Sequence, residues 1–548
     1  MKGMMAVCAA LAAMPLIGGA EQLKPKALMI MLDGMRADVV ENGYAPNLQM
    51  LCAGTWKPGY AGAYALTANT IMDAPSVSAP NHTSIATGVT ASKTNVKNNG
   101  QFKNCDYAKW PSWLARLADA KPELKTLYMF SWKPDEELSP NPKVTFVHGT
   151  DEANGAALPK RMAAPDAPDA VLWFIDLPDH GGHSFGYYPY SVGYMNTVYR
   201  SDRMIGDVLN AIASRPDFAK EDWLILVTGD HGGYWRSHGL MGGQATTVPV
   251  ILAGRHVKQG RIPGTPHNYD LAPTALAHFG LDVAAMDLDG KVLGRETVDD
   301  QPRPLKDGLA IYMPFSEPSA ANGVANGPKA ELRGKTASGA RDGLIGNCLR
   351  VVAETNSLGG VCLKGSEKLA FENGSDFALT LWVRMKAPQK GDPAIIANKD
   401  WDSGRNPGFV LVATKQMDGA KVPGVCVNSA QSNAAGRHDM GPYDIEYGKW
   451  TFYAVTFGKE GSMRFYQGGP DGYLYQMAED ASAITLASGK PFYLGQDGTG
   501  AYKYPFDGDI DEFAFWTRTL SHQEIRRIYE AGRKGFELAD LLNVPAGK

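Results

Sequence analysis

The stretch VLWFIDLPDHGGH at residues 171–183 decides how the first half of the chain is expected to fold. Five apolar residues form a strand-like run that ends in acidic and turn residues, as strands of a buried parallel sheet do. Two similar runs, ALMIML at residues 27–32 and WLILV at residues 223–227, end in the same way. Apolar residues recur at helical spacing over residues 191–213. This alternation predicts an α/β domain with a sheet flanked by helices, whose functional side chains lie at the carboxyl ends of the strands.

The second half of the chain has a different pattern. Short alternating segments at residues 378–385, 450–457 and 511–516 are separated by Gly, Asn, Asp and Pro turns, which is typical of an antiparallel β-sandwich. The polar, proline-bearing stretch at residues 299–304 reads as a linker. We therefore expect an α/β domain over residues 21–300 and an all-β sandwich over residues 307–535.

Composition excludes several classes of protein. The 548 residues are 44% hydrophobic and 20% charged, with a net charge of −4, so no basic surplus indicates a nucleic-acid-binding surface. Residues 1–20 have a lysine at position 2, continue with an apolar run and end in small residues, as a secretory signal peptide does. No later run of about 20 apolar residues predicts a transmembrane segment. The protein is thus expected to be secreted or periplasmic.

Five cysteines follow the predicted signal peptide, and none of them has zinc-site spacing. Because an exported protein can form disulfides, we expect Cys52 to pair with Cys105 and Cys348 with Cys362, leaving Cys426 free.

Acidic residues and histidines follow the three apolar runs of the first domain. Taken singly, an aspartate after a strand is commonly a helix cap, and a histidine in a glycine-rich loop is commonly a surface residue. Together they would converge on one edge of the sheet and suffice for two zinc-type ions. The residues are Asp33, Asp179, His183, Asp230, His231 and His238.

With these residues in view, positions 26 to about 285 resemble the type I phosphodiesterase/nucleotide pyrophosphatase branch of the alkaline phosphatase superfamily. Four motifs carry the resemblance, in family order. They are Leu32-Asp33-Gly34, Ser78-Ala79-Pro80-Asn81-His82 with Thr87-Gly88, Pro178 to His183, and Asp230-His231-Gly232.

The resemblance implies a role for each matching residue. One divalent ion, expected to be zinc, would be bound by Asp33, Ser78, Asp230 and His231, and a second by Asp179, His183 and His238. Ser78 would also be the nucleophile, giving a phosphoseryl intermediate, and Asn99 would contact a phosphate oxygen. The substrate would be a small phosphate ester.

The match to the family pattern is incomplete. Ser78 stands where the pyrophosphatases usually have Thr, and the closing histidine could be His238 or, as the second choice, His267. A sulfatase needs Arg at the position of His82, and a monoesterase needs Arg where Asp135 stands. The lack of arginine at both positions favours a phosphodiesterase or nucleotide pyrophosphatase, with phosphomonoesterase and sulfatase as alternatives.

The second half resembles a laminin G-type, concanavalin A-like domain, above all at residues 506–512, which read FDGDIDE. Such domains bind glycans, often hold one calcium ion, or act as spacers. A glycan and a calcium ion are therefore candidate ligands of residues 307–535. The rival class of protein is a glycan-binding or adhesion protein whose hydrolase domain is inactive.

Overall fold

The computed structural model describes residues 23–42, 44–239, 243–298, 300–354, 359–369, 376–391, 393–400, 408–414, 424–429, 446–458, 462–469, 472–480, 488–497, 500 and 504–544. The predicted signal peptide at residues 1–20 lies outside them. Across the described residues, no helix is long and apolar enough to cross a membrane.

The first domain is built on one eight-stranded sheet of described residues, in the order β4-β3-β5-β1-β6-β7-β2-β8. The three predicted strands are its neighbouring central strands β5, β1 and β6, and they run parallel. The sheet as a whole is mixed, because β7 runs antiparallel to both β6 and β2. The strands are β1 (Lys24–Leu32), β2 (Ala61–Asn69), β3 (Thr126–Phe130), β4 (Thr145–His148), β5 (Ala170–Ile175), β6 (Glu221–Gly229), β7 (Thr247–Gly254) and β8 (Gly260–Arg261).

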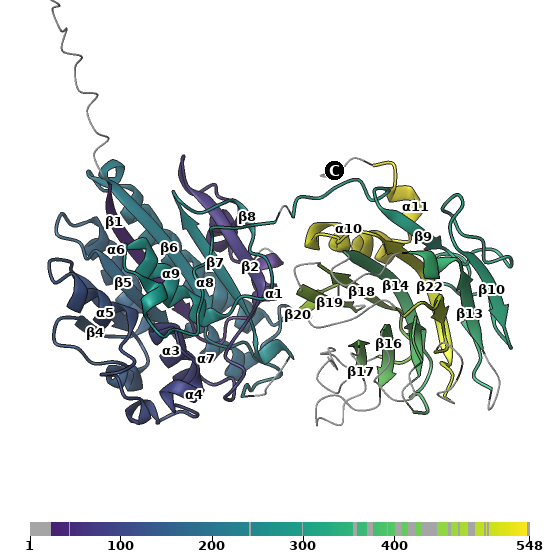
Figure 1. The fold of residues 1–548 in the computed structure, drawn as a ribbon, viewed down its shortest axis with the longest axis horizontal. Helices are drawn as coiled ribbons and strands as arrows, with labels where there is room; N and C mark the ends of the chain where they lie inside the picture. Colours follow the sequence, from purple (N-terminus) through teal and green to yellow (C-terminus); the bar gives the residue numbers. More distant parts are fainter. Residues whose placement is uncertain are drawn as a thin grey trace, which may run out of the picture.

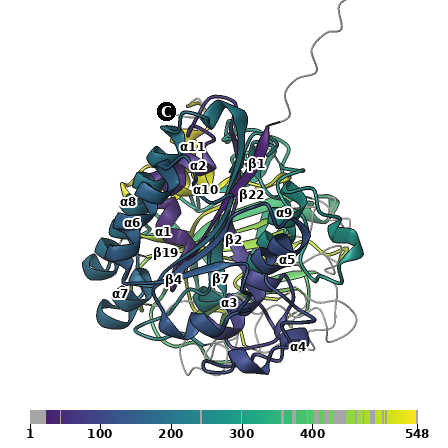
Figure 2. The same ribbon diagram turned by 90° about the vertical axis from the view of Figure 1, so that its left-hand side faces the viewer.

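Helices cover both faces of this sheet (Figure 2). Along β1, Leu28 and Ile30 pack into the core on one face, whereas Met29 and Met31 pack into the core on the other, which explains the unbroken apolar run. One face carries α1 (Ala37–Glu41), α2 (Pro46–Cys52), α6 (Asp151–Ala163) and α8 (Val192–Ala213); the other carries α3 (Ser78–Thr87), α5 (Trp113–Ala120) and α9 (Leu271–His278). The predicted α/β fold is confirmed.

The second domain is a β-sandwich with one apolar core between two sheets. Among the described residues, one sheet has the order β10-β13-β21-β15-β16-β17 and the other β11-β12-β22-β14-β18-β19-β20, with β9 beside β22. The strands are β9 (Leu309–Met313), β10 (Lys329–Arg333), β11 (Ala337–Ala340), β12 (Cys348–Val351), β13 (Gly360–Lys364), β14 (Phe377–Met385), β15 (Ala394–Ala397), β16 (Phe409–Thr414), β17 (Gly424–Ser429), β18 (Thr451–Phe457), β19 (Ser462–Gly468), β20 (Leu474–Asp480), β21 (Phe492–Leu494) and β22 (Gly508–Trp516).

A helix, α10 (His522–Arg533), packs on the outer face of the second of these sheets. Ser521 and Glu524 form a capping box at its start, which satisfies backbone N–H groups of the first turn. The short α11 (Leu538–Leu541) follows it. The predicted sandwich is confirmed, with this terminal helix as part of its packing.

The two domains lie side by side, and β20 of the sandwich faces β2 of the first domain (Figure 1). The side chain of Gln244 donates to the carbonyl oxygen of Gln476 at 2.8 Å. Arg526 donates to the carbonyl oxygen of Glu41 at 3.1 Å. The sandwich is therefore docked against the segment that leads into β7, as well as against α1.

The expected disulfides are wrong. The four cysteines in described positions whose side chains are placed, Cys52, Cys105, Cys348 and Cys362, are all free and buried. Cys52 and Cys105 pack into cores on opposite faces of the first sheet, and Cys348 and Cys362 stand on strands of different sandwich sheets. Spacing along the chain could not reveal that the first pair lies on opposite faces of one sheet and the second pair on two different sheets. Cys426 lies in β17, at a position whose side chain is outside the described set.

Candidate active site

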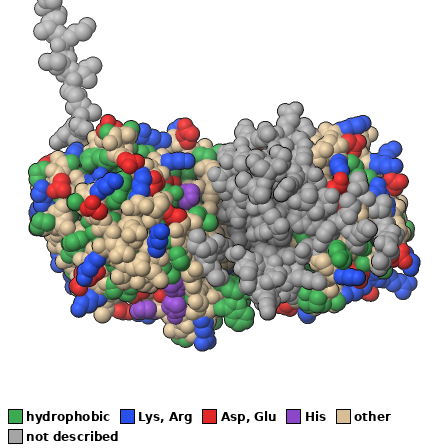
Figure 3. Space-filling model, turned by 60° about the horizontal axis from the view of Figure 1, so that its bottom comes forward, with side chains coloured by type: hydrophobic (Ala, Val, Ile, Leu, Met, Phe, Trp, Pro, Cys, Tyr) green, Lys and Arg blue, Asp and Glu red, His purple; other side chains and the backbone are tan. Residues whose placement is uncertain are grey.

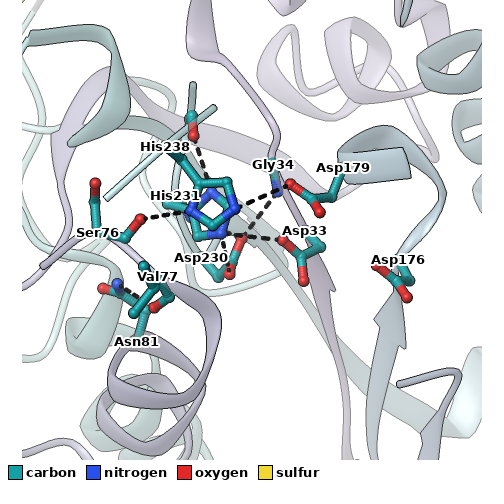
Figure 4. A network of polar contacts seen from close by, with 12 residues as sticks. Asp33, Gly34, Ser76, Val77, Asn81, Asp176, Asp179, Asp230, His231 and His238 are labelled. Atoms are coloured by element: carbon teal, nitrogen blue, oxygen red, sulfur yellow. Dashed lines mark hydrogen bonds and ion pairs between the residues drawn. The ribbon is translucent and has the colours of Figure 1, made fainter. Parts of the chain in front are cut away.

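The carboxyl ends of β1, β5 and β6 bring the predicted polar residues together (Figure 4). Asp33 directly follows β1, Asp230 directly follows β6, and Asp179 lies in α7 (Leu177–Phe185) after β5. Gly34 has a φ of 65°, and a Cβ there would lie 2.8 Å from the Cα of Asp179. Only glycine therefore allows the turn after β1 and the close approach of the turn after β5.

The first group of donors contains Asp33, Asp230 and His231. The Nε2 atom of His231 lies 3.2 Å from Oδ1 of Asp33 and 3.3 Å from Oδ2 of Asp230. Two ligands at zinc distances of about 2.0–2.1 Å in tetrahedral geometry are separated by about 3.3 Å. The three atoms are thus spaced as ligands of one ion.

The second group contains Asp179, His183 and His238. The Nε2 atom of His183 lies 3.3 Å from Oδ2 of Asp179 and 3.1 Å from Nε2 of His238. The Nε2 atom of His238 lies 3.8 Å from Oδ1 of Asp179. This group is more open than the first, because the side chain of His183 is 45% exposed whereas that of Asp230 is fully buried.

The predicted histidine ligands share one feature of orientation. In each of them the Nδ1 atom contacts a backbone carbonyl oxygen, which can only accept, so Nδ1 carries the hydrogen and Nε2 presents a lone pair. The acceptors are the carbonyl oxygens of Arg236 for His183 at 2.9 Å, of Gly232 for His231 at 2.9 Å and of Ser76 for His238 at 3.1 Å.

Buried polar atoms at the centre of the site provide the test of whether metal ions fit. Oδ1 of Asp33, Oδ2 of Asp230 and Nε2 of His231 are buried without a hydrogen-bond partner among the described residues. Such atoms are costly to bury unless something else contacts them. Carboxylate oxygens and imidazole nitrogens are zinc ligands, so divalent cations fit this cluster. In the described chain, the atoms that could hold an ion group as Asp179 with His231 and His238, and as Asp33 with His82 and Asp230, which divides the donors differently from the two expected sets and places His183 in neither group.

Two pKa values of the site agree with this assignment, whereas the hydrogen bond to Asp179 raises the pKa of His183 to about 9, so a cation bound there would have to displace a proton. Burial, followed by the negative charges of Asp230 and Asp179, raises the pKa of Asp33 well above its usual range. Burial, followed by the charge of His231, lowers the pKa of His238 to about 4. A cation would relieve the repulsion between the carboxylates, and His238 is already neutral at neutral pH, as a ligand must be.

Ser78 is the first residue of α3 and is buried. The backbone N–H of the next residue, Ala79, donates to Oδ1 of Asn99 at 3.0 Å. Asn99 is therefore brought to the start of the helix that carries Ser78, although twenty residues separate Ala79 from Asn99 in the chain. Because the amide oxygen of Asn99 accepts this hydrogen bond, its NH₂ group can donate to another acceptor.

His267, the alternative ligand, has a different role. Its side chain caps the 3₁₀ helix η5 (Asn268–Asp270) and stacks on the ring of Tyr269, with centroids 4.8 Å apart. The groups of possible ligands found in the described chain contain His238 and not His267.

Sequence reasoning missed four residues that hold the site. No structural role was predicted for His82, the last residue of the nucleophile motif, or for Asp135, which stands where a monoesterase has arginine; both are fully buried and contact each other at 2.9 Å. Tyr187 donates a short hydrogen bond to Oδ1 of Asp179. Arg36, fully buried, donates to the carbonyl oxygens of Tyr187 and Gly233 and so joins the two ligand-bearing loops. Burial of His82 could have been inferred from its place in the helix motif, but its partner Asp135 could not.

Comparisons with known sequence families give the same picture. Residues 27–126 match the type I phosphodiesterase/nucleotide pyrophosphatase family, residues 137–281 the sulfatase family, and residues 359–526 the concanavalin A-like lectin/glucanases superfamily. A comparison with curated proteins found no match. The first domain is thus a hydrolase domain of the alkaline phosphatase superfamily, of sulfatase or phosphodiesterase type. It is followed by a laminin G/concanavalin A-like domain.

Solved structures with related shapes include both branches. Murine ectonucleotide pyrophosphatase/phosphodiesterase 5, in complex with AMP, is 14% identical, with 49% of this chain and 97% of that chain covered and a TM-score of 0.39. A 2-O GAG sulfatase is 14% identical, with 51% and 76% covered and a TM-score of 0.39. Domain 4 of an extracellular arabinanase from Geobacillus stearothermophilus, in complex with arabinotriose, is 18% identical, with 40% and 98% covered and a TM-score of 0.29. At such TM-scores, no argument about activity follows.

Proposed function

We propose that the protein is an exported two-metal phosphoric ester hydrolase that attacks its substrate with Ser78, acting on a phosphodiester or a pyrophosphate. The observation that carries the proposal is the pair of adjacent donor groups at the strand ends. Their atoms are spaced as zinc ligands, and buried atoms of the first group have no hydrogen-bond partner among the described residues. Ser78 at the start of α3 and Asn99 beside it complete the set.

Each residue would have a defined task. When bound, the two cations would lower the pKa of a hydroxyl group and place positive charge near the phosphoryl oxygens. Ser78 Oγ would attack phosphorus and expel the alcohol, which leaves the phosphoryl group on the serine; water would then cleave this ester and restore Ser78. The NH₂ group of Asn99 would donate to a phosphoryl oxygen and hold it in place.

The charges around the site favour a diester over a monoester. A dianionic phosphate is usually bound by bidentate arginine contacts. Arg36 is committed to Asp38, through a contact of 3.0 Å and a shorter one at the second nitrogen, and to backbone oxygens. Asp135, at the position where a monoesterase has arginine, is buried against His82. Arg36 and Asp135 therefore do not supply the bidentate arginine contact that would bind the second negative charge of a phosphate monoester.

The sulfatase family match supports a second candidate reaction, the hydrolysis of a sulfate ester. That match spans residues 137–281 and so does not include Ser78. A sulfatase nucleophile is a formylglycine made within a motif that has arginine where this chain has His82. The pattern around Ser78 therefore supports phosphate over sulfate.

The test is turnover of bis-p-nitrophenyl phosphate, p-nitrophenyl phosphate and p-nitrophenyl sulfate by the zinc-loaded protein. We expect the diester to be cleaved fastest and the sulfate not at all. Cleavage of only the sulfate, or equal inactivity of the wild type and of S78A on all three, would overturn the proposal.

We also propose that residues 1–20 direct export and that the domains span residues 21–300 and 307–535. We propose further that the second domain binds a glycan, which its lectin/glucanases family match supports.

Calcium binding by the second domain stays a prediction. In the FDGDIDE segment, Asp509 pairs with Arg350 and Arg384, and Asp511 accepts backbone N–H groups. Acidic and basic side chains of the first domain are intermixed on the face shown in Figure 3.

A further inference from the structure

A chain of buried polar contacts runs from the sheet to the first group of donors, and His82 is its middle member. The hydroxyl of Tyr128 donates to Oδ2 of Asp135 at 2.6 Å. Oδ1 of Asp135 lies 2.9 Å from Nδ1 of His82. All three side chains are buried, with His82 and Asp135 fully inaccessible to solvent.

The ring of His82 has little freedom to turn. It packs edge-on against Trp132, with centroids 5.6 Å apart, and tilted against Phe174 at 4.6 Å. Because the carboxylate of Asp135 can only accept, Nδ1 of His82 carries a hydrogen and the ring orientation is fixed from that side. The opposite atom, Nε2, is therefore aimed at one place.

That place is the gap between the two carboxylates of the first donor group. Nε2 of His82 lies 3.2 Å from Oδ2 of Asp230 and 3.7 Å from Oδ2 of Asp33. Oδ1 of Asp230 already accepts from the backbone N–H groups of Gly34 at 3.0 Å and His231 at 2.7 Å. Nε2 of His82 can hold this oxygen of Asp230, the one that faces the donors, only by donating to it, so the positioning role requires a hydrogen on both ring nitrogens of His82.

We propose that His82, held by Asp135, is a positioning residue that orients Asp230 and Asp33 for a divalent cation. This inference rests on the proposed function and deepens it. Residues that orient metal ligands typically change metal affinity by about 10–100-fold when they are replaced. Asp135 then has a role in this chain that differs from phosphate binding: it fixes the imidazole that fixes the carboxylates.

The test measures zinc affinity and stoichiometry of the full-length protein by competition with a chelator, which needs no activity. H82L removes both nitrogen donors and keeps an apolar side chain against Phe174, whereas H82Q keeps an amide donor. The matched control is H278L, which removes a partly buried histidine at the opposite end of the strands, where it contacts backbone oxygens of Lys26 and Asp222.

We expect H82L to bind two zinc ions, one of them about 10–100-fold more weakly than the wild type, and H82Q to recover part of the loss. D135N should weaken the same ion, and the double variant should be no weaker than H82L, because both changes break one chain of contacts. Excess zinc should restore kcat in H82L, a recovery that a general loss of packing would not give.

Two results would overturn the inference. Loss of one zinc ion per chain in folded H82L would show that His82 is a ligand. A zinc affinity of H82L that equals that of the wild type or of H278L would show that His82 only packs. If H82L does not fold, D135N decides the matter, since unchanged zinc affinity in that variant contradicts the proposed chain. Absence of zinc from the wild type would instead refute the proposed function.

Discussion

Replacing His238 or His267 by alanine separates a ligand of the second group from a structural residue. Each change removes one imidazole, so the two variants are matched in chemistry. His238 Nε2 lies 3.1 Å from that of His183, and its ring stacks on His231 with centroids 3.9 Å apart. His267 instead caps η5 and stacks on Tyr269. H238A should therefore lose metal, and H267A should lose only stability.

The size of each effect follows from the geometry. Structural zinc sites bind with about 10–16 kcal/mol shared among four ligands, or about 3 kcal/mol for each, which is on the order of a hundredfold in affinity. The second group has three assigned ligands, so H238A leaves two. Loss of a helix cap costs about 1 kcal/mol, which is the expected effect of H267A on the free energy of unfolding.

Elemental analysis after dialysis, with denaturant unfolding of the same samples, measures both quantities. We expect about one zinc ion per chain in H238A and little turnover of the diester, whereas H267A should hold both ions. The reasoning is refuted if H267A loses the ion and H238A keeps it, because the second donor group would then be wrongly assembled.

Three further outcomes are expected. S78A should fold, retain most of its metal and lose turnover by more than tenfold, measured with the diester. G62A should lower the free energy of unfolding by up to roughly 3 kcal/mol, since its Cβ would lie 2.0 Å from the carbonyl oxygen of Leu51; the control is G359A, whose Cβ would lie no closer than 3.7 Å to another atom. A fragment that ends at residue 300 should still cleave small esters but melt at lower temperature, because it loses the contact between Glu41 and Arg526; an inactive, folded fragment would show that the sandwich completes the site.

The α/β domain is predictable from the sequence because burial of a strand on both faces requires an unbroken apolar run. The part of a strand that is covered on both faces must be apolar, and residues 27–32 of β1, the whole of β5 and residues 223–227 of β6 are. The ends of three such strands form one edge, so the sequence alone is enough to place Asp33 and Asp230 together. The antiparallel course of β7 is not predictable in the same way, because an apolar run carries no information on its direction.

The parts of the site that escaped prediction depend on contacts between distant segments. Asp135 meets His82 across 53 positions of sequence, and Arg36 reaches Gly233 across 197. A buried polar residue of this kind has no local pattern, since its role is defined only by the partner that satisfies it. The wrong disulfides have the same origin: spacing along the chain does not tell on which side of a sheet a cysteine lies.

The central claim is that Ser78 attacks phosphorus in a site that holds two divalent cations, and trapping the reacting enzyme tests it most directly. The zinc-loaded protein is quenched in acid during turnover of bis-p-nitrophenyl phosphate, and its peptides are mapped by mass spectrometry. We predict a p-nitrophenyl phosphoryl group on Ser78, and no adduct in S78A. An adduct on a different residue, or a formylglycine at position 78, would contradict the account.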